Sequence, residues 1–316
     1  MRILITGGFG FIGGRVAQQL HKAGHKIVLG SRKVSSSPKW LPQSEGVKTD
    51  WHDGRALEQI CKGVDVVIHA AGMNAQDCAA DPVAALEFNG LATTRLVTAA
   101  SRAGVKRFVY LSTVHVYANT LIGPISESTC PRNLHPYATS HLAGENAVLR
   151  ASQDGKIEGI VLRVSNAFGA PLHKDVNCWM LLVNDLCRQA VTECRLLLRS
   201  DGLQRRDFVT LQDASRAVSH VICLSNAQVS EGIFNVGGAW APRVIDLVEL
   251  IQTRCTVVLG FTPEIICPKP GDSDVTHELD FRIDRLLASG FELSGNVEAE
   301  IDATLLLCRE LFGGGR

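Results

Sequence analysis

The stretch RILITGGFGFIGG, residues 2–14, decides the fold of this chain. RILIT is apolar and rich in isoleucine, which is typical of a buried strand. Three glycines, Gly7, Gly10 and Gly13, follow it in a G-x-x-G-x-x-G pattern, and a helical apolar pattern comes next. Glycines at these positions permit a tight turn, a close approach to a pyrophosphate and close packing of the helix on the sheet. The pattern therefore predicts a strand–loop–helix unit that binds a dinucleotide.

Short β-branched runs alternate with helical patterns along the rest of the chain. The further expected strands are HKIVLGS (25–31), VDVVIHAAG (64–72), KRFVYLST (106–113), GIVLRVSN (159–166) and GIFNVGG (232–238). Helical spacing is found over 14–24, 56–63 and 89–104. Strands and helices that alternate in this way form a parallel sheet with helices on both faces. The predicted fold class is therefore α/β, with a doubly wound parallel sheet.

The composition argues against several classes of partner. The chain has 316 residues, with 32 Lys and Arg against 32 Asp and Glu, so no basic field attracts nucleic acid or anionic lipid. Ten cysteines contain no C-x-x-C pair, which argues against a zinc site and indicates free thiols in a reducing cytosol. No secretory leader and no apolar run long enough to span a bilayer are found. We expect a cytoplasmic protein with no metal, nucleic-acid or membrane partner.

Motifs along nearly the whole chain resemble those of the extended short-chain dehydrogenases/reductases that act on nucleotide sugars. The similar segments are TGGFGFIG (6–13), TDWHD (49–53), HAAG (69–72), NGLATTRLVTAA (89–100), LSTVHVYA (111–118), HPYATSH (135–141), RVSNAFG (163–169), QRRDFVTLQDASRA (204–217), FNVGG (234–238) and PKPGD (268–272). The resemblance implies a Rossmann-type dinucleotide-binding domain over 1–166, to whose sheet 207–236 returns. A smaller C-terminal α/β substrate lobe, mainly 167–316, would follow. We also expect a homodimer.

The resemblance implies that the dinucleotide contacts several loops at the carboxyl edge of the sheet. The residues concerned are Gly7, Gly10, Phe11, Ile12, Gly13, Ser31, Arg32, Asp50, Ala70, Ala71, Gly72, Asn89, Tyr137 and His141. Members that prefer NAD place an aspartate after the second strand, where this chain has Ser31, Arg32 and Lys33. Because a cationic cluster attracts a 2′-phosphate, NADP is the first expectation and NAD the second. The alternative is that Arg32 is only a surface charge.

The resemblance places the catalytic groups at Thr113, Tyr137 and His141. In the family, the tyrosine exchanges a proton with the sugar oxygen, the hydroxyl residue hydrogen-bonds to that oxygen, and a lysine binds ribose and lowers the pKa of the tyrosine. An ammonium about 5 Å away contributes about 3 kcal/mol, or roughly two pKa units. His141 takes the place of that lysine. The imidazole is charged by its surroundings, or it shuttles a proton while binding ribose, or the site has lost activity.

Three residues are implied in substrate binding, namely Asn166, Arg206 and Lys269. A guanidinium at Arg206 would bind the diphosphate of a nucleotide sugar. Val114 and His115 stand where sugar 4,6-dehydratases carry acidic residues, which argues against a dehydratase. The expected activity is that of an NAD(P)-dependent oxidoreductase, of the ketoreductase type, which acts on a ring ketone or hydroxyl, at C4, of a nucleotide-activated sugar. The alternatives are a 4-epimerase with tightly bound NAD and a catalytically impaired dinucleotide-binding subunit.

Overall fold

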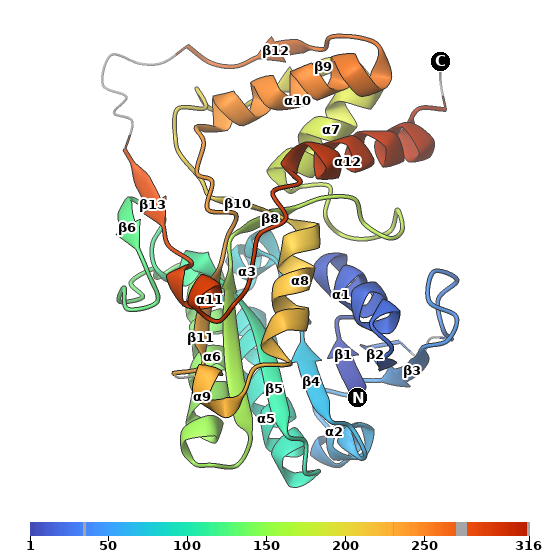
Figure 1. Cartoon of the computed structure of the whole chain (residues 1–316), viewed down its shortest axis with the longest axis vertical. Helices are drawn as coiled ribbons and strands as arrows, with labels where there is room; N and C mark the ends of the chain where they lie inside the picture. Colours follow the sequence, from blue (N-terminus) through green and yellow to red (C-terminus); the bar gives the residue numbers. More distant parts are fainter. Residues whose placement is uncertain (34–35, 230, 270–276, 315–316) are drawn as a thin grey trace.

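A seven-stranded parallel sheet forms the centre of the protein (Figure 1). The computed structural model describes residues 1–33, 36–229, 231–269 and 277–314. The strand order is β11-β7-β5-β4-β1-β2-β3, and every neighbouring pair is parallel. These strands are β1 (Arg2–Thr6), β2 (Lys26–Ser31), β3 (Glu45–Lys48), β4 (Val66–His69), β5 (Arg107–Thr113), β7 (Glu158–Val164) and β11 (Ile233–Val236). The winding reverses between β1 and β4, which opens a crevice at their carboxyl ends. This topology confirms the predicted fold class.

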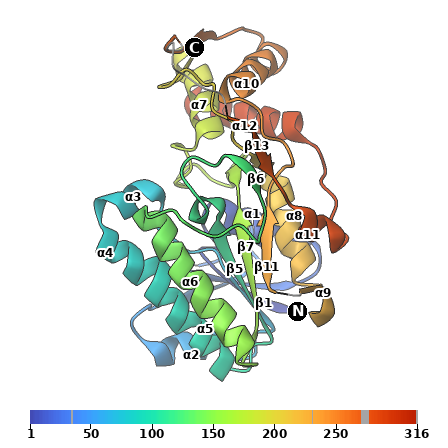
Figure 2. The same ribbon diagram turned by 90° about the vertical axis from the view of Figure 1, so that its left-hand side faces the viewer.

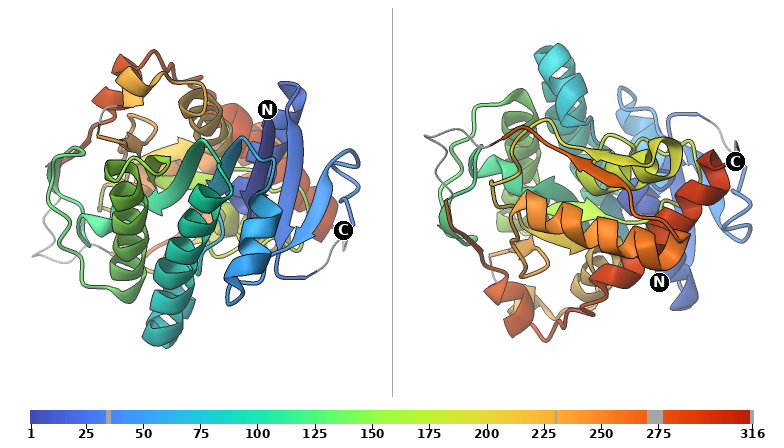
Figure 3. Two further views of the ribbon diagram at one scale, coloured as in Figure 1. Left: turned by 90° about the horizontal axis from the view of Figure 1, so that it is seen from below. Right: turned by 90° about the horizontal axis from the view of Figure 1, so that it is seen from above.

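Helices cover both faces of the sheet because side chains on each strand point to alternate faces. On β1, Ile3 and Ile5 join one apolar core and Leu4 joins the other. The first face carries α1 (Phe11–Lys22), α8 (Leu211–Val221) and α11 (Asp284–Ala288), and the second carries α2 (Gly54–Cys61), α5 (Ala92–Arg102) and α6 (Pro136–Gln153). Figure 2 shows α6 and α5 in front of the sheet, and the left view of Figure 3 shows α6, α5 and α2 along one side of it. The ends of the strands are therefore the places where a ligand can enter.

A further apolar core lies beyond the carboxyl end of the sheet, at the top of Figure 1. It is built from α7 (Leu182–Glu193), α10 (Val244–Leu259), α12 (Val297–Phe312) and the strand pair β9 (Arg195–Leu197) and β12 (Glu264–Ile266). Two short parallel pairs lie between this core and the sheet: β8 (Asn166–Phe168) with β10 (Phe208–Thr210), and β6 (Gly123–Ile125) with β13 (Leu279–Phe281). The division of the chain at residue 166 stays a prediction. Leu286 and Phe291 pack into the core beneath α1 and α8.

Several short elements lie where the sequence predicted none. They are β3, α3 (Ala75–Ala80), α4 (Pro82–Ala85), the first half of the π-helical turn η1 (Leu86–Leu91), the 3-10 turn η2 (Val114–Val116) and α9 (Asn226–Val229). The edge strand β3 has no fully buried residue, so it lacks the apolar alternation by which strands are recognised. The helices α3 and α4 start at the capping side chains of Asn74 and Asp81. The helix expected over 89–104 is observed as η1 followed by α5.

Candidate active site

The glycine loop after β1 has the conformation of an anion-binding turn. Gly7 has a φ of +72°, and a Cβ there would lie 2.7 Å from the carbonyl oxygen of Ala70. A Cβ at Gly13 would collide with the carbonyl oxygen of Gly7, so α1 approaches the loop only because Gly13 has no side chain. Helix α1 starts at Phe11 with Gly10 as its N-cap, and no side chain caps it. The first backbone N–H groups of α1 are therefore open to an anion such as a pyrophosphate.

The end of β2 presents a hydroxyl and two cations. Ser31 is the last residue of β2, and the exposed Arg32 and Lys33 follow it. The guanidinium carbon of Arg32 lies 5.6 Å from the centre of the Phe88 ring, a cation–π contact that holds it over η1. Within the described residues, neither Arg32 nor Lys33 forms an ion pair. Asp50 accepts a backbone hydrogen bond of 3.1 Å within its own turn. This end of the crevice can accept a phosphate dianion.

The loop after β4 lies between the glycine loop and helix α6 and contacts both, the helix through Asn89. Asn89 is fully buried, and its Oδ1 accepts a hydrogen bond of 2.8 Å from the backbone N–H of Met73. Its Nδ2 donates to the Oγ of Ser140 on α6 at 3.0 Å. Asn89 therefore holds the loop against the helix that carries Tyr137. The loop contains Ala70, Ala71 and Gly72, which precede Met73.

Thr113, Tyr137 and His141 meet at the carboxyl edge of the sheet. Thr113 ends β5, Tyr137 lies in the first turn of α6, and His141 lies one turn later. The ring centres of Tyr137 and His141 are 4.6 Å apart, in an edge-to-face arrangement. Burial raises the pKa of the Tyr137 phenol above its ordinary value, and a hydrogen bond with Thr113 offsets part of that effect. The phenol is therefore protonated at neutral pH and can donate a proton.

His141 is buried and uncharged at neutral pH. Burial lowers the pKa of its imidazole to about 4, with a smaller contribution from the charge of His115. Its Nδ1 lies 2.9 Å from the hydroxyl of Tyr110. Its Nε2 faces Gly72, where a Cβ would lie 3.7 Å from it. The structure therefore opposes the first of the three readings of His141, an imidazolium that replaces the charge of the lysine.

Two cavities, of about 260 and 300 Å³, lie between the sheet and the lobe of α7, α10 and α12. The larger one reaches Thr113 and the start of α1 at Phe11 and Ile12. The smaller one is bounded by the loop 118–121 and by His135. Both cavities are therefore continuous with the candidate catalytic groups. The residues that line both are His115, Tyr137, Asn166 and Arg206.

The residues predicted to bind substrate are only partly brought together. The guanidinium of Arg206 lines both cavities and forms no side-chain hydrogen bond or ion pair with any other described residue. The side-chain amide of Asn166 donates a hydrogen bond of 2.8 Å to the backbone carbonyl of Asp207. Lys269 is exposed and lines neither cavity. The rest of its motif, 270–272, lies outside the described residues.

His115 is a residue that the sequence motifs undervalued. The motifs identify it only as a replacement for an acidic residue, yet its ring centre lies 6.4 Å from that of Tyr137. Burial lowers the pKa of its imidazole, and the charges of Arg206 and His135 lower it as well. A neutral imidazole can both donate and accept a hydrogen bond to a ligand in the cavities. The sequence feature that could have indicated a place in the site is its position two residues after Thr113, in the turn that follows β5.

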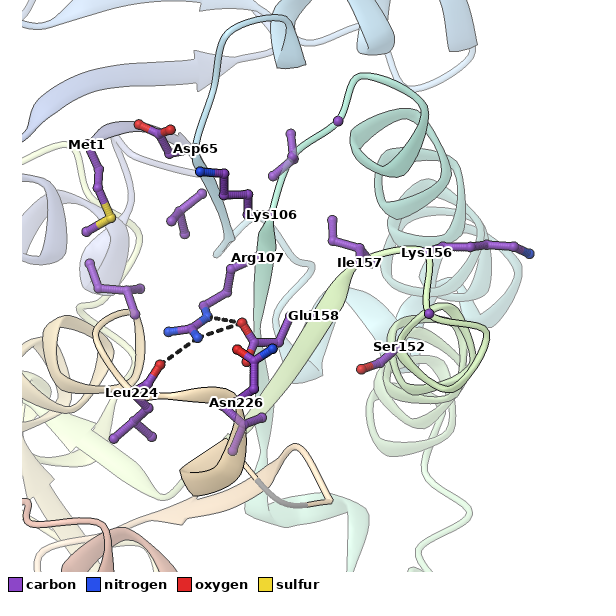
Figure 4. Close-up of a pocket in the computed structure, with 16 residues that line it drawn as sticks. Met1, Asp65, Lys106, Arg107, Ser152, Lys156, Ile157, Glu158, Leu224 and Asn226 are labelled. Atoms are coloured by element: carbon purple, nitrogen blue, oxygen red, sulfur yellow. Dashed lines mark hydrogen bonds and ion pairs between the residues drawn. The ribbon is translucent and has the colours of Figure 1, made fainter.

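A larger cavity, of about 900 Å³, lies at the opposite, amino edge of the sheet. Figure 4 shows Arg107 at its centre, joined to Glu158 and to the backbone of Leu224. Arg107 is buried, and its guanidinium also donates to the carbonyl oxygen of Val221. These contacts connect β5 and β7 to the segment after α8. The charged groups at the centre of this cavity are therefore already paired with the protein.

Comparisons with known proteins agree with the motifs and the fold. The model of the NAD dependent epimerase/dehydratase family matches residues 3–237. The dTDP-6-deoxy-L-talose 4-dehydrogenase (NAD(P)(+)) of Kitasatospora kifunensis is 30% identical over 297 residues, which cover 90% of this chain and 88% of that protein. The UDP-glucose 4-epimerase of Haemophilus influenzae is 27% identical over 289 residues, 83% of this chain and 85% of that protein.

A solved structure with a similar fold is the UDP-glucose 4-epimerase of Thermus thermophilus in complex with NAD. It has a TM-score of 0.80 at 22% identity and covers 98% of this chain and 100% of that chain. The resemblance to short-chain dehydrogenases/reductases that act on nucleotide sugars is confirmed, and so is the expectation of an enzyme. The chain belongs to the NAD dependent epimerase/dehydratase family.

Proposed function

We propose that the protein is an NADP-dependent reductase that acts on the C4 carbonyl of a nucleotide-activated sugar. The observation that carries the proposal is the protonated Tyr137, which lies beside Thr113 at the place where the two cavities meet. A sugar ring in these cavities would present a ring oxygen substituent to both hydroxyls. The larger cavity reaches the start of α1, where a dinucleotide would fit.

The pKa of Tyr137 favours reduction over oxidation. An NADPH held at the glycine loop of Gly7, Gly10 and Gly13 would supply the hydride that the carbonyl carbon needs. Tyr137 donates its proton to the carbonyl oxygen, and the hydroxyl of Thr113 hydrogen-bonds to the same oxygen. Oxidation needs the phenolate, and burial disfavours the phenolate while a neutral His141 offers no positive charge to stabilise it. The site therefore suits a proton donor better than a proton acceptor.

The nucleotide diphosphate is assigned to Arg206. A guanidinium without a protein partner is suited to a bidentate contact with a phosphate. Asn166 lies beside it on the wall of both cavities. A role for Lys269 stays a prediction, since the side chain lines neither cavity.

The preference for NADP is assigned to the end of β2. Ser31 removes the carboxylate that would repel a 2′-phosphate, and Arg32 is held nearby by Phe88. Replacing Arg32 by aspartate should change the ratio of NADP to NAD affinity by about 10- to 100-fold in favour of NAD, the worth of a charge-assisted hydrogen bond. Lys39→Asp is the matched charge reversal, since Lys39 is exposed and has no assigned role. An unchanged ratio in Arg32→Asp would reduce Arg32 to surface charge.

A 4-epimerase with retained NAD is the second candidate, because relatives in this family carry that name. A catalytically impaired binding subunit is the third, because His141 is neutral. These candidates differ in stoichiometry. A reductase consumes one NADPH for each 4-keto-sugar reduced, whereas an epimerase interconverts the C4 epimers with no net change in cofactor.

The decisive experiment combines mass spectrometry of nucleotides that co-purify with NADPH turnover on a panel of UDP- and dTDP-4-keto-sugars. We expect stoichiometric NADPH oxidation and no retained NAD. Retained NAD with interconversion of 4-hydroxy epimers would replace the reductase by the epimerase. Cofactor binding without turnover of any nucleotide sugar would support the third candidate, a catalytically impaired binding subunit.

A homodimer is proposed through the helices on the face that Figure 2 turns to the viewer. Val83 on α4, Leu86 on η1 and Leu91 at its end are 70%, 50% and 46% exposed. Large apolar side chains gathered on one surface are typical of an interface. Sedimentation of wild type and of a Val83→Asp, Leu86→Asp double variant tests this, with a monomer expected for the variant. No helix in the described part of the chain is long and apolar enough to cross a membrane, and a cytoplasmic location stays a prediction.

A further inference from the structure

Tyr110 lies between two buried histidines and belongs to none of the catalytic groups above. It is part of β5 and is 1% exposed. Its ring is stacked against His69 at 5.6 Å and against His141 at 5.8 Å between ring centres. Burial raises the pKa of its phenol well above the ordinary value, so the hydroxyl keeps its hydrogen. That hydroxyl lies 2.9 Å from Nδ1 of His141.

The hydrogen bonds around His69 define where its hydrogen is. The hydroxyl of Thr93 donates to the carbonyl oxygen of Asn89 at 2.6 Å, so the Thr93 oxygen can only accept from other groups. Nε2 of His69 lies 2.9 Å from that oxygen and must therefore be the donor. Burial lowers the pKa of His69 to about 3, so the ring is neutral and its Nδ1 accepts from Thr6 at 2.6 Å. His69 has no atom left for the phenol of Tyr110.

The phenol hydrogen of Tyr110 therefore goes to His141. The Thr93 oxygen also lies beside this hydroxyl, and one of its two lone pairs already accepts the hydrogen of His69. An imidazole nitrogen is a better acceptor than an alcohol oxygen, because it is the more basic atom. Nδ1 of His141 is thus the acceptor, and the single hydrogen of the neutral ring stays on Nε2.

We propose that Tyr110 is a positioning residue: it holds His141 in the tautomer with hydrogen on Nε2, the nitrogen that faces Gly72 and the dinucleotide crevice. The inference rests on the proposed function and on the role toward the cofactor ribose that the family resemblance implies for His141. A lysine at this position is a donor only. An Nε2–H is also a donor, so Tyr110 lets a neutral histidine replace the hydrogen bond of the lysine while the positive charge is absent. According to this proposal, His141 keeps the hydrogen-bond donor of the lysine and lacks its positive charge.

The first test observes the tautomer in the protein without ligands. In ¹⁵N-labelled wild type, long-range ¹H–¹⁵N correlation should show His141 with a bare Nδ1 and a protonated Nε2, and the signals of His141 are assigned by their loss in His141→Lys. In Tyr110→Phe the ring stack is kept and the hydroxyl is removed, so we expect a mixture of both tautomers. Hydrogen on Nδ1 in wild type, or an unchanged spectrum in Tyr110→Phe, would overturn the proposal.

The second test measures NADPH affinity by fluorescence in a double-mutant cycle. Tyr110→Phe should raise the dissociation constant about five- to tenfold, the worth of one hydrogen bond. In the His141→Lys background the same change should have no further effect, because an ammonium presents donors without help. A loss of equal size in both backgrounds would show that Tyr110 acts through general packing, and would overturn the proposal.

Tyr117→Phe is the matched control. Its hydroxyl donates to Oδ1 of Asn235 at 2.7 Å and is equally buried, but it does not contact His141. This variant should lose stability and keep the NADPH affinity and the His141 spectrum of wild type. These tests are independent of the proposed function. If the protein turned over no nucleotide sugar, the tautomer of His141 and the NADPH affinities of the variants could still be measured.

Discussion

The two edges of the sheet carry cavities of opposite character. The amino edge holds the larger cavity, about 900 Å³, and its central cation Arg107 is bonded to Glu158 and to two backbone carbonyls (Figure 4). The carboxyl edge holds cavities of only about 260 and 300 Å³. There the guanidinium of Arg206 has no ion-pair partner among the residues that the structure describes, and the phenol of Tyr137 retains its proton. A guanidinium without an ion-pair partner and a phenol with a raised pKa, and not cavity volume, distinguish the candidate site from a structural gap.

The largest expected effect removes the proton donor at the carboxyl edge. Tyr137→Phe should lower kcat by about 10²- to 10⁴-fold, the range of general acid catalysis. NADPH affinity should stay within about twofold of wild type, since the ring is kept. Steady-state kinetics and fluorescence titration measure the two quantities. If turnover were undiminished, a group other than Tyr137 would be the general acid. The carboxyl edge would then no longer differ from the amino edge by this phenol.

The next effect concerns stability at the amino edge. Arg107→Leu leaves Glu158 and two carbonyls without their donor, so we expect a loss of about 3 kcal/mol in the free energy of unfolding. Turnover of the folded variant should equal that of wild type, because Arg107 is at the other end of β5 from Thr113. Urea unfolding and kcat/KM at 15 °C are the measurements. A fall in kcat/KM without a fall in stability would make the amino edge functional.

Low pH should destabilise the protein through the carboxyl edge, because the buried histidines His69 and His141 lie there and no histidine is among the described residues that line the amino cavity. Their folded pKa values, about 3 and about 4, are below the unfolded value of 6.5. Their contribution to stability is therefore complete above pH 6.5 and is lost as the pH falls from 6.5 toward about 4 for His141 and toward about 3 for His69. At pH 5 each histidine should cost about 2 kcal/mol of unfolding free energy.

Urea unfolding of wild type and His141→Gln at pH 7.5 and pH 5 tests this directly. The glutamine variant does not titrate at this position, so its loss between the two pH values should be smaller by about 2 kcal/mol. Equal losses in the two proteins would show that His141 is not held neutral by burial.

The smallest effect is expected for an exposed lysine of the amino cavity. Lys106→Gln should change stability by less than about 0.5 kcal/mol and leave the KM for the nucleotide sugar unaltered. Arg206→Gln, the matched loss of charge at the carboxyl edge, should raise that KM about tenfold or more. If both variants raise KM by the same factor, substrate binding depends on the net charge of the protein. Arg206 would then make no specific contact that distinguishes the carboxyl edge from the amino edge.

The sequence by itself determined the local units of this protein. The glycine spacing after RILIT specified a strand, a tight turn and a helix, because φ at Gly7 and the contact at Gly13 depend on residues close in the chain. The four-residue step from Tyr137 to His141 placed both on one helical face. The order of such motifs was sufficient for the family and the parallel sheet. It missed β3, whose partly exposed residues carry no apolar alternation.

Only the tertiary structure decided how the site works. The charge of His141 depends on atoms from β4, β5 and α6 that exclude water together, so no local pattern could predict a pKa of about 4. The contact of Arg32 with Phe88, and the convergence of His115, Asn166 and Arg206 on Tyr137, join segments far apart in the chain. Desolvation and cavity shape are sums over neighbours in space, whereas a sequence motif reports only neighbours along the chain.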